Sequence, residues 1–256
     1  MNNQNIEEQL KDYEGKDKVI SSIEMLRLLE DTTQSIQIKS KIPSLDTTLG
    51  GFEGGEVTVI SGKTGNGKTL LAQTLTINFE EQSIPCLWFS FEVMPRNFLK
   101  SFGHNLPAFY LPMQLKVNSL LWLESRIYEA ILKYGIRVVF IDHLHFLIDI
   151  KGKHNISLEI GFVMRSLKRI AIKHNICIFL ISHIAKINPD KELDIEDCRD
   201  SSFVGQESDN VIMIWRKKNT ETEAYIKIVK NRKQGFYKKF LVSKFNGKLG
   251  EIDAKY

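Results

Sequence analysis

The sequence predicts an α/β fold in which a mainly parallel sheet is covered by helices on both faces and ends in a C-terminal antiparallel hairpin. Five short apolar runs alternate with longer stretches of helical periodicity, the pattern of strands joined by helical crossovers. These runs are apolar throughout, as expected for parallel strands buried on both faces. Two further runs near the C-terminus follow each other closely and indicate a hairpin.

Length and composition fit one such domain with a short appendage, since 256 residues that are 43% hydrophobic can bury a full core. The N-terminus lacks the apolar segment of a signal peptide, and no window approaches the roughly eighteen apolar residues of a membrane span. We therefore expect a soluble protein of the cytoplasm, with no membrane partner. Cys86, Cys177 and Cys198 lack paired or metal-type spacing, so buried reduced thiols are expected.

The N-terminal region divides into a flexible segment, 1–18, and a helix with its connector, 19–40. Ser21 and Glu24 form a capping-box pattern in front of a short apolar stretch, which predicts the helix. The α/β domain is expected to occupy 41–256. Its strands are expected at 57–61, 86–91, 137–142, 176–182, 210–215, 224–230 and 238–243. Its helices are expected at 67–81, 95–103, 119–134 and 157–174.

The segment between the first strand and the first helix has the spacing of a phosphate-binding loop, GKTGNGKT. Backbone N–H groups of such a glycine-rich loop, with the helix N-terminus, surround a phosphate chain. Lys68 would reach the β- and γ-phosphates of ATP or another nucleoside triphosphate, and Thr69 would hold Mg²⁺. The remaining residues expected to contact the nucleotide are Gly62, Thr64, Gly65, Asn66 and Gly67.

Three polar residues end apolar strands, where ligands bind in open α/β sheets. Glu92 could orient and deprotonate the water that attacks the γ-phosphate, or it could be a solvated strand-end residue. Asp142 fits a Mg²⁺-binding carboxylate, although aspartates also cap such turns. His183 could contact the γ-phosphate, or it could be a histidine at the rim of the core.

The C-terminal region is basic, with twelve Lys/Arg and four Asp/Glu in 216–256, which permits a polyanionic partner without requiring one. Within it, Arg232 follows a predicted strand, and a guanidinium suits a transferring phosphoryl group. The hairpin that carries it is expected at the far edge of the sheet from the phosphate loop. Arg232 would therefore most naturally serve the nucleotide of a neighbouring subunit.

The motifs, in their order, resemble the RecA-like motor domain of the hexameric replicative helicases: the DnaB, Twinkle and phage primase-helicase family. The resemblance covers residue 41 to about 253. It rests on these segments: KIPSLDTTLGGFEGGEVTVISG, GKTGNGKT, WFSFEVMP, VVFIDHLHFLID, LISHIAKINPDK, DCRDSSFVGQESDNVIMIWR, VKNRKQG and KFNGKLGEID. It implies a RecA-like P-loop NTPase that hydrolyses ATP and acts as a DNA helicase or single-stranded DNA translocase.

The resemblance also implies a role for each matched residue. Lys68, Thr69 and Asp142 would bind phosphate and Mg²⁺, and Glu92 would be the catalytic base. His183 would sense the γ-phosphate, and Arg232, with Lys230 as its companion, would be an arginine finger acting in trans. The nucleotide base would lie between Arg216 and Phe245.

Partners follow from the same resemblance. Single-stranded DNA would be bound by loops at 148–156 and 186–203, with phosphate contacts from Lys186, Lys191, Arg199 and Ser201. The second loop is also rich in Asp and Glu, so a surface loop without nucleic-acid contact is the alternative. The helix in 19–30 would pack on the adjacent subunit and close a homo-oligomeric ring, expected to be a hexamer or heptamer.

The sequence shows no primase domain or DnaB-type helical N-terminal domain ahead of the motor, so a stand-alone motor, a piece of a longer protein and a mobile-element protein recruited by separate partners are all open. A separate primase or loader is therefore a further possible partner. The alternative function is a RecA-fold ATPase that acts as a nucleotide-switched assembly or loading factor without unwinding. A third possibility is a non-motor interaction protein in which bound ATP has only a structural role. An intact Glu92 argues against it, because such a site needs no catalytic base.

Overall fold

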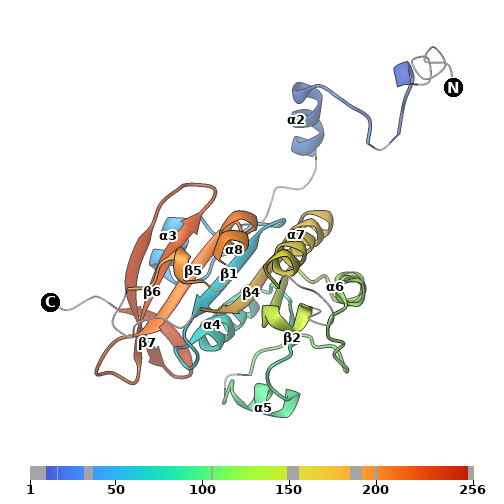
Figure 1. Cartoon of the computed structure of the whole chain (residues 1–256). Helices are drawn as coiled ribbons and strands as arrows, with labels where there is room; N and C mark the ends of the chain where they lie inside the picture. The colour runs from blue at the N-terminus through green and yellow to red at the C-terminus, as the bar shows by residue number, and fades with distance from the viewer. Residues whose placement is uncertain are drawn as a thin grey trace. The chain divides into compact units, whose positions relative to one another are not determined.

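The computed structural model describes residues 10–15, 17–31, 37–104, 106–148, 156–184, 192–198 and 201–252 (Figure 1). The chain divides into two compact units, Met1–Ile36 and Gln37–Tyr256. The first unit contains helix α2 (Ser22–Asp31). The N–H of Glu24 donates to Ser21 Oγ at 3.1 Å, which is the helix start that the capping pattern predicts. The boundaries predicted within 1–40 stay a prediction.

The second unit is built around one eight-stranded sheet with the order β2-β3-β4-β1-β5-β6-β7-β8. Its strands are β1 (Val57–Gly62), β2 (Cys86–Ser90), β3 (Val138–Asp142), β4 (Cys177–His183), β5 (Asn210–Arg216), β6 (Glu223–Asn231), β7 (Lys238–Phe245) and β8 (Lys248–Ile252). The neighbours from β2 to β5 pair in parallel, and those from β5 to β8 pair antiparallel. The predicted mainly parallel sheet with a C-terminal antiparallel hairpin is confirmed.

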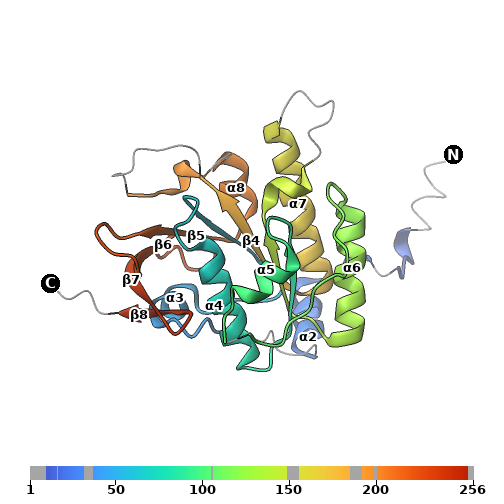
Figure 2. The same cartoon turned by 90° about the horizontal axis from the view of Figure 1, so that it is seen from below.

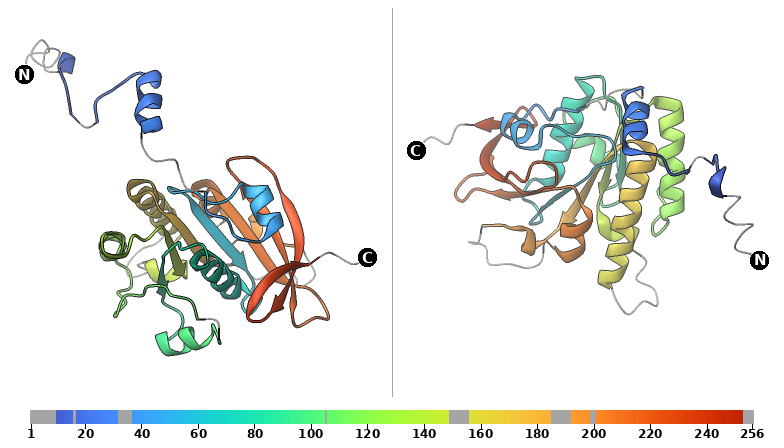
Figure 3. Two further views of the ribbon diagram at one scale, coloured as in Figure 1. Left: turned by 180° about the vertical axis from the view of Figure 1, so that it is seen from behind. Right: turned by 90° about the horizontal axis from the view of Figure 1, so that it is seen from above.

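Helices cover both faces of this sheet (Figures 2 and 3). One apolar cluster joins the sheet to α3 (Pro43–Leu49), α4 (Lys68–Glu80) and α5 (Pro95–Lys100). A second cluster joins the opposite face to α6 (Leu120–Tyr134), α7 (Ile156–His174) and α8 (Ser201–Glu207). Two 3₁₀ helices, η1 (Leu144–Leu147) and η2 (Ile195–Asp197), lie in connecting segments. Among the described residues, no helix is long and apolar enough to cross a membrane.

Besides the two 3₁₀ helices, three elements of the second unit were not expected from the sequence: α3, α8 and β8. Both helices have only seven residues, which is too short for a clear helical period. Strand β8 follows a tight turn in which Asn246 and Gly247 have φ angles of 49° and 80°. Asn-Gly between apolar runs is a strong hairpin signal, so β8 could have been predicted. Cys86, Cys177 and Cys198 are buried free thiols, as expected.

Phe179 lies in an aromatic cluster between the sheet and α4. It is fully buried, and its ring centroid lies 4.8 Å from that of Phe52 and 4.9 Å from that of Phe140. Phe179→Ala is expected to lower the free energy of unfolding by about 3–5 kcal/mol, because the cavity can relax only in part. Urea denaturation followed by circular dichroism measures the change.

The control for this prediction is Leu132→Ala, which removes an apolar side chain that is 68% exposed on α6. Its unfolding free energy is expected to change by less than about 0.5 kcal/mol. A loss below about 1 kcal/mol for Phe179→Ala would contradict the tight packing of this cluster.

Candidate nucleotide-binding site

The predicted phosphate loop connects β1 to α4 at the carboxyl end of the central strand. A Cβ atom at Gly62 would lie 2.1 Å from the backbone oxygen of Ile214 on the neighbouring strand β5, so only glycine fits there. Gly67 stands just before α4 with a φ of 101°, a backbone conformation that favours glycine. The glycines therefore shape the loop and direct the N-terminus of α4 toward it, as phosphate binding requires.

Lys68 and Thr69 begin α4 and lie inside this loop. The Lys68 ammonium donates to the backbone oxygens of Gly62 at 2.9 Å and Lys63 at 3.1 Å. Burial lowers the pKa of Lys68 from its ordinary value, although Asp142 and Glu92 oppose that shift. A phosphate chain would add further negative charge beside Lys68 and so favour its charged form.

Asp142 ends β3 and fits the predicted metal site. The Thr69 hydroxyl donates to Asp142 Oδ2 at 3.1 Å. Asp142 Oδ1 is buried and accepts no hydrogen bond from the described residues. Burial first, and then the charge of Glu92, raise the pKa of Asp142 to about 6. A buried carboxylate oxygen next to a hydroxyl suits a hard divalent cation such as Mg²⁺, which would favour the ionised carboxylate.

Glu92 and His183 meet the phosphate loop in one pocket of about 180 Å³. This pocket is lined by Thr64, Gly65, Gly67, Lys68, Thr69, Leu70, Glu92 and His183. His183 Nδ1 lies 3.5 Å from Thr64 Oγ1. The fold therefore brings the predicted base, the predicted sensor and the phosphate loop together, because β1, β2 and β4 run in the same direction and end at the same edge of the sheet.

Sequence reasoning missed His143, although it follows Asp142 directly. Its Nδ1 lies 3.3 Å from Glu92 Oε2, and its ring centroid lies 4.6 Å from that of His183. Glu92, His143 and His183 each offer one ligand atom within 4.8 Å of the others. Two imidazoles and a carboxylate suit a transition metal better than Mg²⁺. The only signal in the sequence was the position of His143 at the end of the same strand.

Arg216 and Phe245 end β5 and β7, and these strands run in the same direction because each pairs antiparallel with β6. Both residues therefore lie at the edge of the sheet that carries the phosphate loop. The Arg216 backbone N–H donates to Asn66 Oδ1 at 2.8 Å, and its guanidinium donates to the Gly65 backbone oxygen at 3.2 Å. Phe245 is 76% exposed. Their role in holding the base stays a prediction.

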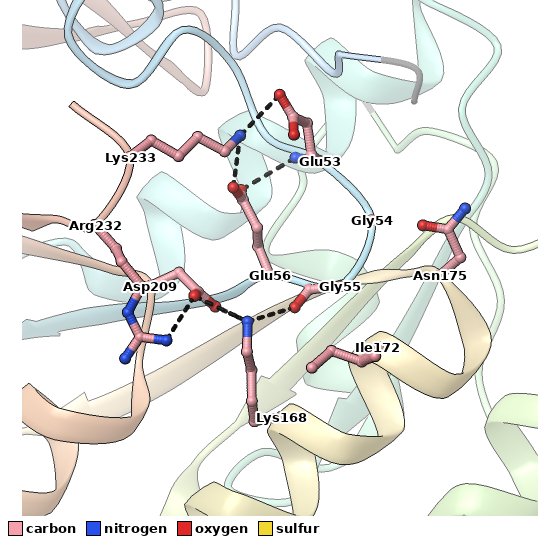
Figure 4. Close-up of a pocket in the computed structure, with 10 residues that line it drawn as sticks. All are labelled: Glu53, Gly54, Gly55, Glu56, Lys168, Ile172, Asn175, Asp209, Arg232 and Lys233. Atoms are coloured by element: carbon pink, nitrogen blue, oxygen red, sulfur yellow. Dashed lines mark hydrogen bonds and ion pairs between the residues drawn. The ribbon is translucent and has the colours of Figure 1, made fainter. Parts of the chain in front are cut away.

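Arg232 lies at the opposite end of the sheet, where β1 begins (Figure 4). It follows β6, which runs antiparallel to β5, and its backbone N–H donates to the backbone oxygen of Asp209 at 2.9 Å. Arg232 is thus separated from the phosphate loop mainly along the direction of the strands. The prediction had instead placed Arg232 at the far side edge of the sheet. Since β1 has six residues with a rise of about 3.3 Å each, the distance along the strands is roughly 20 Å.

Lys230, the predicted companion of Arg232, contacts the C-terminal end of α8. Its ammonium donates to the backbone oxygens of Gly205 and Ser208. Burial, and then the charge of Arg232, lower the pKa of Lys230 to about 8. A cation at a helix C-terminus is favourable, so in this conformation Lys230 stabilises α8. A catalytic role for Lys230 stays a prediction.

Most of the predicted DNA contacts cannot be placed. Lys186, Lys191 and Arg199 lie outside the described residues, and so does the side chain of Ser201, the first residue of α8. In the described part of the second loop, acidic side chains pair with lysines of β6 and β7. Glu192 binds Lys239 at 2.6 Å and Lys227 at 3.2 Å, and Asp194 binds Lys227 at 3.0 Å. Part of the negative charge of this loop is thereby offset.

A glycine-rich loop before α4, with carboxylates at the ends of neighbouring parallel strands, defines a nucleotide-binding protein of the P-loop class. The family model described as DnaB-like helicase C terminal domain matches residues 112–254, which is more than half of the chain. The chain belongs to this family, as the motifs predict.

Curated relatives agree with this assignment. The chain is 23% identical over 253 residues to the replicative DNA helicase DnaB of Treponema pallidum (strain Nichols), covering 86% of this chain and 54% of that protein. It is 24% identical over 226 residues to the protein of that name from Mycoplasma pneumoniae (strain ATCC 29342 / M129 / Subtype 1), covering 73% and 48%. The chain thus spans about half the length of these relatives.

Solved structures confirm the fold. A structure described as that of a DnaB-like replicative helicase and its interactions with primase superposes with a TM-score of 0.76 at 16% identity, covering 98% of this chain and 71% of that one. A second solved structure, described as an ATPase domain, superposes with a TM-score of 0.76 at 17% identity, covering 90% and 97%. At these identities the likeness concerns the fold, which is RecA-like as predicted.

Proposed function

We propose that this chain is the ATP-hydrolysing motor of a replicative DNA helicase of the hexameric type, which moves along single-stranded DNA. One observation carries the proposal. The groups suited to phosphate, metal and water lie at one end of the sheet, and Arg232 lies at the other. In a ring of identical subunits, a heterologous interface between these two ends would bring them together at every contact. The family and the names of the relatives support the helicase activity.

The proposed chemistry is an in-line attack of water on the γ-phosphate of ATP. Glu92 orients this water and accepts its proton, and the Lys68 ammonium stabilises charge on the phosphate oxygens. His183, in the same pocket, contacts the γ-phosphate and so distinguishes ATP from ADP. Thr69 and Asp142 would hold Mg²⁺, which would offset the charge of the β- and γ-phosphates.

Arg232 completes the site of the neighbouring subunit in this proposal. Its side chain is 47% exposed and lies at an edge of the sheet that an adjacent subunit can reach. A guanidinium offers paired N–H donors that match phosphate oxygens. Because the arginine comes from another chain, hydrolysis depends on assembly.

The ring itself would be closed by a contact that repeats from subunit to subunit. Helix α2 exposes Ile23, Leu26 and Leu29, at 64%, 56% and 59%. An amphipathic helix with exposed apolar side chains gains stability by packing on another surface. We assign that surface to the adjacent subunit, so that the contact is heterologous and closes into a ring.

Single-stranded DNA is the proposed substrate of the loops at 148–156 and 186–203. A motor that moves along any sequence must bind the phosphate backbone. Such binding weakens as the salt concentration rises, because the release of counterions from the DNA then contributes less free energy. A separate primase or loader is the further partner that we propose. The proposed setting is the cytoplasm of a bacterial or phage-infected cell.

The hydrolysis rate tests the whole proposal. The ATP turnover per subunit is expected to rise cooperatively with protein concentration, and to rise again with single-stranded DNA at low salt. The measurement is a coupled phosphate-release assay across a concentration series, with duplex DNA of equal nucleotide content as the control. A rate that is independent of concentration and indifferent to DNA would contradict the motor and favour a nucleotide-switched assembly factor.

A further inference from the structure

Asp209 is a buried carboxylate at the end of the sheet where Arg232 lies (Figure 4). It precedes β5, and its side chain is only 8% exposed. Its oxygens accept from the backbone N–H of Val57 at 2.8 Å, from the Lys168 ammonium at 2.7 and 2.9 Å, and from Arg232 Nη1 at 3.2 Å. One carboxylate therefore joins the first residue of β1, helix α7 and the proposed finger.

The backbone of Asp209 makes the same connection. Its N–H donates to the Val57 oxygen at 2.8 Å, and its oxygen accepts from the Arg232 N–H at 2.9 Å. Asp209 is thus hydrogen-bonded to β1 and to Arg232 through both its main chain and its side chain. Strand β1 leads to the phosphate loop, so the position of Arg232 is fixed relative to the nucleotide site of its own subunit.

The Arg232 guanidinium is held at two points. Besides the contact with Asp209, its Nη2 donates to the backbone oxygen of Gln206 at 2.6 Å. A guanidinium has five N–H donors in a rigid fork, and these two contacts account for two of them. The side chain is still 47% exposed. The fork is therefore oriented by its own subunit while part of it stays accessible to a phosphate.

The ion pairs of Asp209 also affect how much of the positive charge of Arg232 is neutralised. The single negative charge of Asp209 is shared between Lys168 and Arg232, which together carry two positive charges. Lys168 is anchored further by donating to the Gly55 backbone oxygen at 2.7 Å. Because Lys168 shares the charge of Asp209, the pairing orients Arg232 and neutralises its guanidinium only in part, so that it can still attract a phosphate of the adjacent subunit.

We infer that Asp209 is a positioning residue, which holds the Arg232 guanidinium in the orientation required by the nucleotide of the neighbouring subunit. The inference rests on the proposed role of Arg232 as a finger in trans. It adds that Asp209 acts only through Arg232, so that its removal affects turnover and not the binding of nucleotide to its own subunit.

The test is Asp209→Asn, which keeps the shape and an acceptor for the Val57 N–H but removes the charge. The kcat for ATP is expected to fall about ten- to a hundredfold, because small misplacements of a catalytic group have effects of this size. The affinity for a fluorescent ATP analogue is expected to change less than twofold. A raised kcat, which would mean that Asp209 restrains the finger, overturns the inference.

A double-mutant cycle with Arg232→Ala separates this inference from the proposed function. Asp209→Asn is expected to cause no further loss in the Arg232→Ala background, measured as single-turnover hydrolysis. If Asp209→Asn instead lowers the rate by the same factor in the Arg232→Ala background as in the unaltered protein, Asp209 acts independently of Arg232 and the inference fails. If Arg232→Ala itself has normal turnover, the finger assignment fails. This result differs from the one that contradicts the positioning role of Asp209, so the two can be told apart.

Glu56→Gln is the matched control. It weakens a partly buried ion pair in the same network, the 2.6 Å contact between Glu56 and Lys233, which does not involve Arg232. Its kcat is expected to be near that of the unaltered protein, and melting temperatures identify any loss of folding in either variant. Should the asparagine variant not fold, Asp209→Glu keeps the charge but displaces the carboxylate. The kcat of Asp209→Glu is also expected to fall, and an unchanged kcat contradicts the inference.

Discussion

Arg232→Ala is expected to lower ATP turnover by roughly 10³- to 10⁵-fold, the range seen when an arginine finger is absent. Nucleotide binding is expected to stay nearly unchanged, because Arg232 lies at the end of the sheet opposite the phosphate loop of its own chain. The guanidinium matters mainly in the transition state, where charge develops on the transferring phosphoryl group. Steady-state hydrolysis, together with titration of a fluorescent ATP analogue, measures both quantities.

Arg126→Ala is the control for this prediction. Arg126 is an arginine of similar exposure, 42% against 47%, and it also forms an ion pair with a carboxylate, Glu129 on α6. Its turnover is expected to equal that of the unaltered protein, since exposed ion pairs contribute little. Normal turnover by Arg232→Ala would remove the finger assignment, and strongly weakened nucleotide binding would contradict a role confined to the transition state.

Glu92→Gln is expected to lower turnover by roughly 10²- to 10⁴-fold, because glutamine keeps the size of the side chain but cannot accept a proton from water. ATP should still bind, since Lys68, Thr69 and Asp142 are unchanged. The comparison variant is Glu80→Gln, which alters the last residue of α4 on the surface and should leave turnover intact. Turnover that survives in Glu92→Gln would assign the base to another group.

The same variant reports on coupling between subunits. When Glu92→Gln subunits are mixed with unaltered ones, hydrolysis is expected to fall by more than the fraction of altered subunits. The reason is that every mixed ring would contain at least one site that binds ATP without hydrolysing it. The assay is hydrolysis against the mixing ratio in the presence of single-stranded DNA. A linear loss would show that the sites work independently.

Much of the fold was predictable because its signals are local. The five parallel strands are continuous apolar runs, and the helices α4, α6 and α7 are long enough to show their period. The meeting of Glu92 and His183 at the phosphate loop was predictable too. Parallel strands joined by helical crossovers all end at the same edge of a sheet, so a polar residue at each end must lie there.

Other features lacked a local signal. Helices α3 and α8 are each about two turns long, and the pattern of so few residues does not distinguish a helix from a loop. The contact of His143 with Glu92 depends on the pairing of β2 with β3, which neither strand encodes by itself. The pairing of Glu192 with Lys239 likewise joins residues far apart in the chain.

The sequence by itself determined the α/β class, the phosphate loop and the identity of the residues at the strand ends, since each depends on neighbouring residues in the chain. Only the tertiary structure decided where Arg232 lies and what holds it. That position follows from the antiparallel direction of β6 and from contacts of Asp209 with Val57, 152 residues away. Such contacts are selected by the packing of the whole sheet, and for this reason no local pattern reveals them.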